Sequence, residues 1–229
     1  MRVKICGMTR VDDAVAAARA GTDFVGLIFA VSPRRATLET ARAVVGALPV
    51  STQAVLVFRD APAGEVVATL DATGARWVQL HGREPVTYLR DLATRRPHVA
   101  LIKAWEVAGP SAADDLLAYL HEAHGAGVRI DAVILDAPKR GPHPGYECLA
   151  AISRRCTARP PEIWCAGGLT PANLVAAIRG VAAQDPSRPG PAGDRGRYDG
   201  VDVAGGVERS AGVKDPALVA QFIAAAGKF

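Results

Sequence analysis

Two residues of this chain combine a reactive side chain with a position at the end of an apolar segment. Cys6 follows the residues RVKI and precedes a glycine, so its thiol can face a ligand rather than the core. There it could act as a base or a nucleophile if its pKa were lowered, although buried cysteines are usually inert. Asp136 ends the apolar run AVIL. A carboxyl group in this position must be exposed or expensively buried, which favours a role as general acid.

Two glycine pairs each follow another apolar segment. They are Gly167-Gly168, after EIWCA, and Gly205-Gly206, after GVDVA. Glycine permits a positive φ and lets backbone N–H groups approach an anion without a Cβ in the way. One such pair indicates only a turn, but two at successive segment ends favour a cradle for phosphate.

Four further polar residues lie close to segment ends. Arg34 and Arg35 follow Pro33, which stiffens the turn, and either guanidinium could bind a carboxylate through two hydrogen bonds. Simple exposure to solvent is the structural alternative for both arginines. His81 follows WVQL and Asp202 lies within GVDV, and we assign both residues to substrate binding because of these positions.

The apolar segments alternate with Ala-rich amphipathic segments along the whole chain. Strands are predicted over 3–6, 24–29, 53–58, 77–80, 99–104, 132–136, 162–165 and 200–203. Helices are predicted over 11–20, 38–48, 63–72, 85–94, 112–126, 145–156, 171–183 and 216–226. Eight units in 229 residues give about 29 residues each, close to the length of one βα unit.

This alternation predicts an α/β protein, namely a single-domain (β/α)₈ TIM barrel over residues 1–229. A doubly wound open sheet is the alternative, but its first turn usually carries a glycine-rich dinucleotide motif, whereas this chain reads CGMTR. In a barrel the carboxyl ends of all strands share one rim, so the residues above are expected to meet there. The segment 185–197, DPSRPGPAGDRGR, is predicted to be a disordered loop on the opposite face.

The composition of the chain argues against several classes of partner and site. The chain is 49% hydrophobic and 22% charged with a net charge of +4, and its basic residues are scattered, so no nucleic-acid or membrane partner is implied. The four cysteines show neither CxxC nor CxxH spacing, which argues against disulfides and a structural zinc site. No signal peptide or membrane span is visible, and we expect a cytoplasmic protein.

Several motifs together resemble the phosphoribosylanthranilate isomerase family. They are KICGMTR, SPRR, QLHGRE, AGGLTPANL and VDVAGGVERSAGVKDP. The resemblance implies an Amadori rearrangement of N-(5-phosphoribosyl)anthranilate in tryptophan biosynthesis, without a cofactor or a metal. It also implies that Cys6 is the general base, that Asp136 is the general acid and that Arg34 meets the anthranilate carboxylate. The glycines of the last two loops match the family's phosphate site.

The chain departs from the family's pattern after Asp136, where the family has a glycine-rich stretch and this sequence reads APKRGPHPGYECL. This difference keeps open an isomerase of the same chemistry acting on another phosphorylated N-glycoside. A third hypothesis is an inactive barrel that binds a phosphorylated metabolite. The presence of Cys6 and Asp136 argues against this hypothesis. A dual-specificity barrel would carry an aspartate in place of Cys6. The expected partner is a small phosphorylated substrate, and a monomer is favoured because no exposed apolar stripe stands out.

Overall fold

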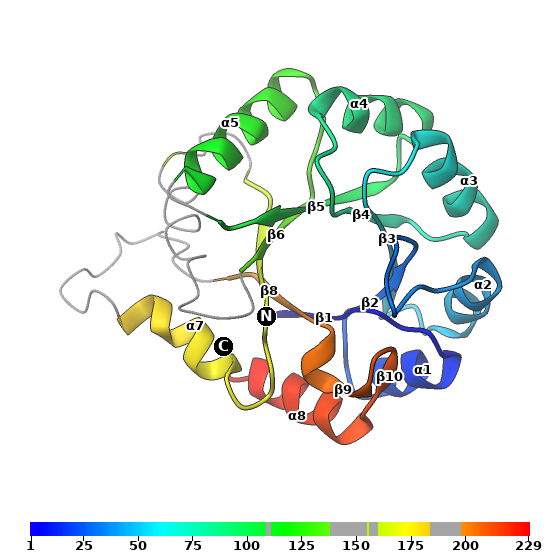
Figure 1. Cartoon of the computed structure of the whole chain (residues 1–229), viewed down its shortest axis with the longest axis vertical. Helices are drawn as coiled ribbons and strands as arrows, with labels where there is room; N and C mark the ends of the chain where they lie inside the picture. Colours follow the sequence, from blue (N-terminus) through cyan, green and yellow to red (C-terminus); the bar gives the residue numbers. More distant parts are fainter. Residues whose placement is uncertain (109–110, 138–154, 156–159, 184–197) are drawn as a thin grey trace.

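Eight parallel strands pair in chain order and close into a barrel in the computed structural model (Figure 1). The structure describes residues 1–108, 111–137, 155, 160–183 and 198–229. The strands are β1 (Arg2–Ile5), β2 (Phe24–Ile28), β3 (Gln53–Phe58), β4 (Trp77–Leu80), β5 (Ala100–Glu106), β6 (Ala132–Asp136), β7 (Glu162–Ala166) and β8 (Gly200–Val203). The predicted (β/α)₈ barrel is confirmed and an open sheet is excluded, because every residue of β8 pairs with β1.

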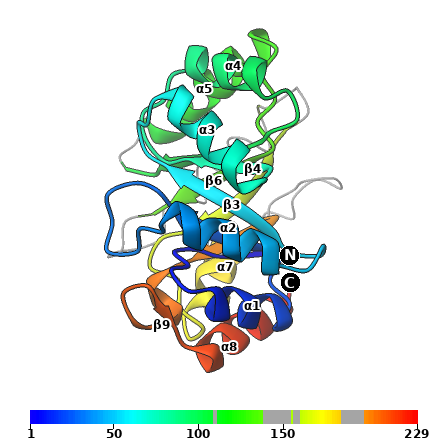
Figure 2. The same cartoon turned by 90° about the vertical axis from the view of Figure 1, so that its right-hand side faces the viewer.

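Helices surround the barrel and cover the outer face of its strands (Figures 1 and 2). In the described part of the chain they are α1 (Val11–Arg19), α2 (Leu38–Ala47), α3 (Ala63–Thr73), α4 (Val86–Arg95), α5 (Ala112–Gly125), α7 (Leu174–Ala183) and α8 (Pro216–Ala226). The helix predicted over 145–156 lies, apart from Arg155, outside the described residues. The loop predicted over 185–197 lies outside them as well.

One helix begins later than its sequence pattern predicts. α7 was expected from Pro171 but begins at Leu174. The backbone N–H of Thr170 donates to Asn173 Oδ1 at 2.7 Å, and the N–H of Asn173 donates to Thr170 Oγ1 at 3.2 Å. These reciprocal bonds close a turn that satisfies backbone groups ahead of the helix. The Asn173 amide also donates to the carbonyl of Gly168 at 2.9 Å, so the turn holds the glycine loop after β7 in place.

A short antiparallel hairpin follows β8, in a segment that the sequence pattern left as a loop. It consists of β9 (Glu208–Ser210) and β10 (Val213–Lys214), and Lys214 stands opposite Glu208 in its register. Side chains directly opposite in an antiparallel pair lie close together. The hairpin thereby brings a lysine and a glutamate together beside the carboxyl end of β8.

Strand residues alternate between the inside of the barrel and the helical layer, as the pleat requires. Phe24, Val55 and Trp164 belong to the cluster that fills the barrel, whereas Leu56 and Phe58 pack in the cluster between strands and helices. Polar side chains interrupt the inner filling, among them Lys4, which is 0% exposed, and Gln79, which is 1% exposed. The inward direction of these two follows from the alternation, since each lies two residues from a member of the inner cluster, Cys6 and Trp77.

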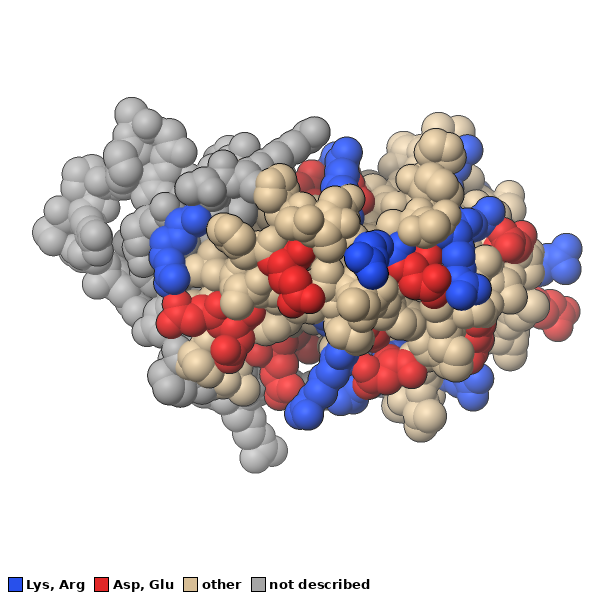
Figure 3. All heavy atoms as spheres, turned by 90° about the horizontal axis from the view of Figure 1, so that it is seen from above, with Lys and Arg blue, Asp and Glu red and all other residues tan. Residues whose placement is uncertain are grey.

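The outer surface mixes charges of both signs. On the face shown in Figure 3, basic and acidic side chains are interspersed among uncharged residues, and neither sign forms an extended patch. Within the described residues, no helix is both long enough and apolar enough to pass through a membrane.

Candidate active site

The predicted site residues lie at or near the carboxyl ends of strands or in the loops that follow them. They are Cys6 after β1, Arg34 after β2, His81 after β4, Asp136 at the end of β6, Gly167 and Gly168 after β7, Asp202 within β8, and Gly205 and Gly206 after β8. Because the strands are parallel and form a closed barrel, these residues occupy one end of it. The structure thus places these residues at the same end of the barrel, where their contacts form two groups, one around Cys6 and Arg34 and the other consisting of His81 and Asp136.

The Cys6 thiol is buried beside an ammonium group. Cys6 is 6% exposed and lies against Gly26 of β2. A Cβ at Gly26 would stand 2.7 Å from Cys6 Sγ and 3.1 Å from Lys4 Nζ, so only glycine leaves room for both groups. Burial raises the pKa of the thiol above its usual value, while the positive charges of Lys4 and Lys214 oppose that rise. The same lysines would stabilise a thiolate formed during a reaction.

A buried ion pair lies directly below this thiol and joins the first strand to the last. Lys4 Nζ donates to Asp202 Oδ1 at 2.9 Å, and the two side chains are 0% and 10% exposed. Burial disfavours the ammonium, but Asp202 and Cys6 outweigh this effect and raise the pKa of Lys4. The carboxylate of Asp202 is thus bound to Lys4, the lysine beside Cys6. The assignment of Asp202 to substrate binding stays a prediction.

The Arg34 guanidinium is held by a carboxylate of the hairpin. Arg34 Nε donates to Glu208 Oε1 at 2.9 Å, and Nη2 donates to Oε2 at 2.7 Å. This fork raises the pKa of Arg34. Burial works against the Glu208 carboxylate, but Arg34 and Lys214 hold its pKa below the usual value. Arg35 is exposed, so Arg34 is the arginine that faces the site.

Lys214 ties the ends of β1 and β8 to the hairpin. Its ammonium donates to the carbonyl oxygens of Cys6 at 2.6 Å and Ala204 at 3.1 Å, and to Glu208 Oε1 at 2.8 Å. Burial lowers the pKa of Lys214, and Glu208 opposes that change. A charged group buried in this way is tolerated because it is fully hydrogen-bonded. Lys214 and Glu208 thus hold both the backbone at Cys6, through its carbonyl oxygen, and the guanidinium of Arg34.

The carboxyl group of Asp136 is less buried than the thiol and meets a histidine. Its side chain is 36% exposed, and Oδ2 lies 3.3 Å from His81 Nε2. The other ring nitrogen of His81, Nδ1, lies 2.9 Å from Gln79 Nε2 inside the barrel. Asp136 is therefore accessible to a ligand, and its Oδ2 is oriented by His81, the residue after β4.

The two glycine loops approach each other closely. A Cβ on Gly206 would collide with the backbone carbonyl of Leu169, in the loop after β7. Gly167 and Gly168 have φ values of +99° and +62°, in the region that favours glycine. The loops after β7 and β8 thus lie in contact, and the phosphate site predicted at their glycines stays a prediction.

A cavity of about 850 Å³ opens at this end of the barrel, beside β4, β5 and β6. His81 and Asp136 line it together with Lys103, Trp105 and Tyr119. The carboxyl group of Asp136 therefore faces a space large enough for a small substrate.

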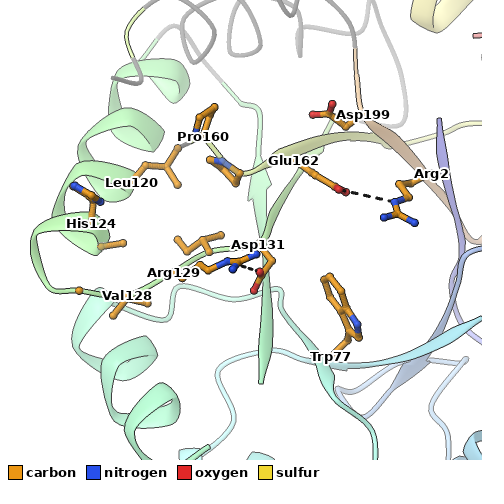
Figure 4. Close-up of a pocket in the computed structure, with 14 residues that line it drawn as sticks. Arg2, Trp77, Leu120, His124, Val128, Arg129, Asp131, Pro160, Glu162 and Asp199 are labelled. Atoms are coloured by element: carbon orange, nitrogen blue, oxygen red, sulfur yellow. Dashed lines mark ion pairs between the residues drawn. The ribbon is translucent and has the colours of Figure 1, made fainter. Parts of the chain in front are cut away.

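A second cavity, of about 880 Å³, lies at the amino ends of the strands (Figure 4). Its charged groups are paired with one another, as Arg129 with Asp131 at 2.7 Å and Arg2 with Glu162 at 3.9 Å. None of the predicted site residues lines it. Active sites of (β/α)₈ barrels form at the carboxyl ends of the strands. The first cavity is therefore the candidate, although His81 and Asp136 are the only predicted site residues that line it.

Several residues of this site were not predicted from the sequence. They are Lys4, Gly26, Gln79, Glu208 and Lys214. Two signals could have found Lys4, namely its alternation with Cys6, which places it inside the barrel, and its position in the motif KICGMTR; Glu208 and Lys214 likewise lie in the motif VDVAGGVERSAGVKDP. The contacts of Glu208 and Lys214 depend on a hairpin that no pattern indicated. No group of three or more potential metal ligands occurs within the described residues.

Comparison with known proteins identifies a single family across nearly the whole chain. The family model described as N-(5'-phosphoribosyl)anthranilate (PRA) isomerase matches residues 3–225. A protein named N-(5'-phosphoribosyl)anthranilate isomerase from Pseudomonas fluorescens is 34% identical over 226 residues, which cover 98% of this chain and 95% of the relative.

Solved structures agree with the sequence comparison. The crystal structure of phosphoribosyl anthranilate isomerase from Thermotoga maritima matches with a TM-score of 0.80 and 28% identity, and covers 100% of both chains. A phosphoribosyl anthranilate isomerase in complex with reduced 1-(o-carboxyphenylamino)-1-deoxyribulose 5-phosphate matches with a TM-score of 0.77 and 28% identity, again over 100% of both chains.

Proposed function

Because this chain belongs to the N-(5'-phosphoribosyl)anthranilate isomerase family, we propose that it isomerises N-(5'-phosphoribosyl)anthranilate in tryptophan biosynthesis. The product is 1-(2-carboxyphenylamino)-1-deoxyribulose 5-phosphate, whose reduced form is bound by the similar protein of known structure. The observation that carries the proposal is the convergence of Cys6, Asp136 and Arg34 at one end of the barrel. These residues supply a base, an acid and an anchor for a carboxylate.

Asp136 acts first, as the general acid. Its carboxyl group donates a proton to the ring oxygen of the ribose while the bond between C1' and that oxygen breaks. The nitrogen lone pair forms the new C=N bond, which gives a protonated Schiff base. The partial exposure of Asp136 beside the cavity supports this role, because a general acid must reach the substrate.

Cys6 acts second, as the general base. The thiolate takes the proton from C2', and the electrons of that C–H bond form a C1'=C2' bond as the iminium nitrogen regains its lone pair. The resulting enolamine then tautomerises to the ketone. Hydrogen moves only within the substrate and the enzyme, so we propose that no cofactor and no metal take part. The ammonium of Lys4 stabilises the thiolate from which this step starts.

Two anion sites orient the substrate between these groups. We assign Arg34 to the anthranilate carboxylate, because Glu208 fixes the guanidinium through Nε and Nη2 while a guanidinium has five N–H donors in all. The glycine loops after β7 and β8 are assigned to the phosphate. Anchoring both ends of a substrate turns binding energy into orientation at the reacting carbons.

We further propose that the enzyme works as a monomer in the cytoplasm, with no nucleic-acid partner. Among the described residues the exposed large apolar side chains are Val31, Leu38 and Val50, too few for a stable apolar interface. A reducing compartment keeps Cys6 as a free thiol, as the proposed base requires. Light scattering after gel filtration should give the mass of one chain.

Complementation tests the proposed function. Expression of this chain should restore growth without tryptophan to a bacterial strain that lacks this isomerase, and Cys6→Ala expressed at the same level should not. Purified protein that isomerised another phosphorylated N-glycoside but not the anthranilate compound would reassign the substrate. Binding of the reduced product without turnover of any N-glycoside would show a catalytically inactive barrel.

A further inference from the structure

We propose that His81 is a positioning residue for Asp136, and that Gln79 sets the tautomer in which His81 donates to the acid. The inference rests on the proposed function, because it concerns the general acid of that reaction. It is drawn from a line of three side chains that runs from the interior of the barrel to the cavity.

The three side chains bridge two strands. Gln79 and His81 lie on the same side of β4, two residues apart, and Asp136 ends β6. Gln79 Nε2 lies 2.9 Å from His81 Nδ1, and His81 Nε2 lies 3.3 Å from Asp136 Oδ2. Gln79 is almost wholly buried, whereas the side chains of His81 and Asp136 are 40% and 36% exposed. The buried end of the line is thus fixed by packing, and the other end meets the cavity.

The acid needs a partner that leaves its proton free to reach the substrate. Before it reacts, Asp136 is a carboxylic acid with one O–H and one oxygen that can accept. After it has protonated the sugar oxygen, Asp136 is a carboxylate and accepts at both oxygens. A neutral imidazole carries its proton on one nitrogen at a time. With this proton on Nε2, His81 donates to Oδ2 of Asp136 in both states, and the acidic proton lies on Oδ1, available to the substrate.

Gln79 sets this tautomer. A carboxamide can present a donor or an acceptor to Nδ1, depending on which way the amide is turned. In the structure Nε2 of Gln79 points to Nδ1, which makes Nδ1 the acceptor and places the proton of His81 on Nε2. Gln79 is almost wholly buried, so its packing limits the movement of this donor.

The proton count balances without a further reactant. His81 keeps its proton on Nε2 before and after the step. The proton that Asp136 delivers to the substrate comes from its own carboxyl group, so His81 orients the acid and is not itself a reactant.

Kinetics of three variants test this role. Gln79→Met removes both ends of the amide at similar volume, and should lower kcat about tenfold, the size of one neutral hydrogen bond, while KM stays within twofold. His81→Leu should lower kcat further. His81→Gln should retain clearly more activity than His81→Leu, because an amide can also donate or accept. His121→Gln, on the exposed face of α5, is the matched control and should behave as the parent.

A spectroscopic measurement tests the hydrogen bonds without relying on turnover. In protein carrying ¹⁵N-labelled histidine, the His81 signal is identified by its disappearance in His81→Gln. The parent should show the proton on Nε2. Gln79→Glu should move it to Nδ1, because a carboxylate at that position only accepts.

The possible outcomes distinguish a failure of the positioning role of His81 from a failure of the proposed isomerase function. Parent-like kcat in Gln79→Met, equal activity of the two His81 variants, or an unchanged histidine signal in Gln79→Glu would overturn the inference. So would a loss of kcat that is matched by losses in melting temperature and in binding of the reduced product, since that pattern shows a merely structural role. A parent enzyme without isomerase activity would overturn the proposed function instead, and the histidine signal would still decide the hydrogen bonding.

Discussion

The Cys6 thiol experiences two opposing influences, burial that favours its neutral form and nearby ammonium groups that favour the thiolate. Burial is the larger influence, and the pKa of Cys6 lies above its usual value. A base acts in its deprotonated form, and a raised pKa means that the thiolate fraction increases as the pH rises. The rate of proton abstraction should therefore increase from neutral into alkaline pH.

Lys4→Met should move this part of the pH profile to higher pH. The substitution removes the ammonium that lowers the pKa of Cys6 and leaves the carboxylate of Asp202, which raises it. Lys228→Met, at an exposed position near the carboxyl terminus, is the control and should leave the profile in place. The measurement is kcat as a function of pH. Superimposed profiles of Lys4→Met and the parent would show that Lys4 does not act on the base.

Arg34→Ala should weaken binding of ligands that carry the ortho carboxylate. A charge-assisted hydrogen bond contributes about 1.5–3 kcal/mol, which corresponds to roughly ten- to hundredfold in affinity. Titration calorimetry with carboxylate and carboxylate-free analogues measures the difference, and exposed Arg35→Ala is the matched control. Equal losses for both analogues would assign Arg34 to the support of Glu208 alone.

At the scale of elements, each βα unit delivers one loop to the same rim, and this is why much of the site was predictable. Apolar runs ending in Cys6 or Asp136 identify the strand ends directly, and parallel pairing in a barrel brings them to one end. Lys4 was missed because an amphipathic alternation ordinarily places a lysine in solvent. Its burial depends on Asp202, nearly 200 residues away, with which it forms a hydrogen bond across the seam of the barrel.

The contact between the loops after β7 and β8 gives a prediction at this scale. Gly206→Ala places a methyl group against the carbonyl oxygen of Leu169, and the backbone of one loop must move. We expect a loss of about 1–3 kcal/mol in stability and weaker binding of the reduced product. Gly46→Ala in α2, where no atom lies within 4 Å of the new Cβ, should be neutral or gain about 0.5–1 kcal/mol. Thermal unfolding and calorimetry compare the two, and identical behaviour would refute the contact.

At the scale of the whole molecule, the barrel is closed by the pairing of β8 with β1. Four pairs of residues make this seam, and one of them, Lys4 opposite Asp202, is also the buried ion pair. The same contact thus contributes to closure and to the environment of the base. Stability and catalysis are coupled at this position.

Asp202→Asn should destabilise the protein by about 3–5 kcal/mol, because it leaves the buried ammonium of Lys4 without its counter-charge. The control is Asp91→Asn, which breaks the exposed pair of Asp91 with Arg95 in α4 and should leave stability unchanged. Urea unfolding measures both. Equal stability of the two variants would contradict a structural role for the ion pair.

The most direct test of the account is the rate at which purified protein isomerises N-(5'-phosphoribosyl)anthranilate, generated in the cuvette, compared with that of Cys6→Ala. The account predicts turnover by the parent and at least a thousandfold loss in the variant, roughly the scale of an acid or base contribution. The variant should still bind the reduced product with the affinity of the parent, since the thiol anchors nothing. A parent that does not turn over this substrate, or a Cys6→Ala variant within tenfold of the parent, would contradict the account.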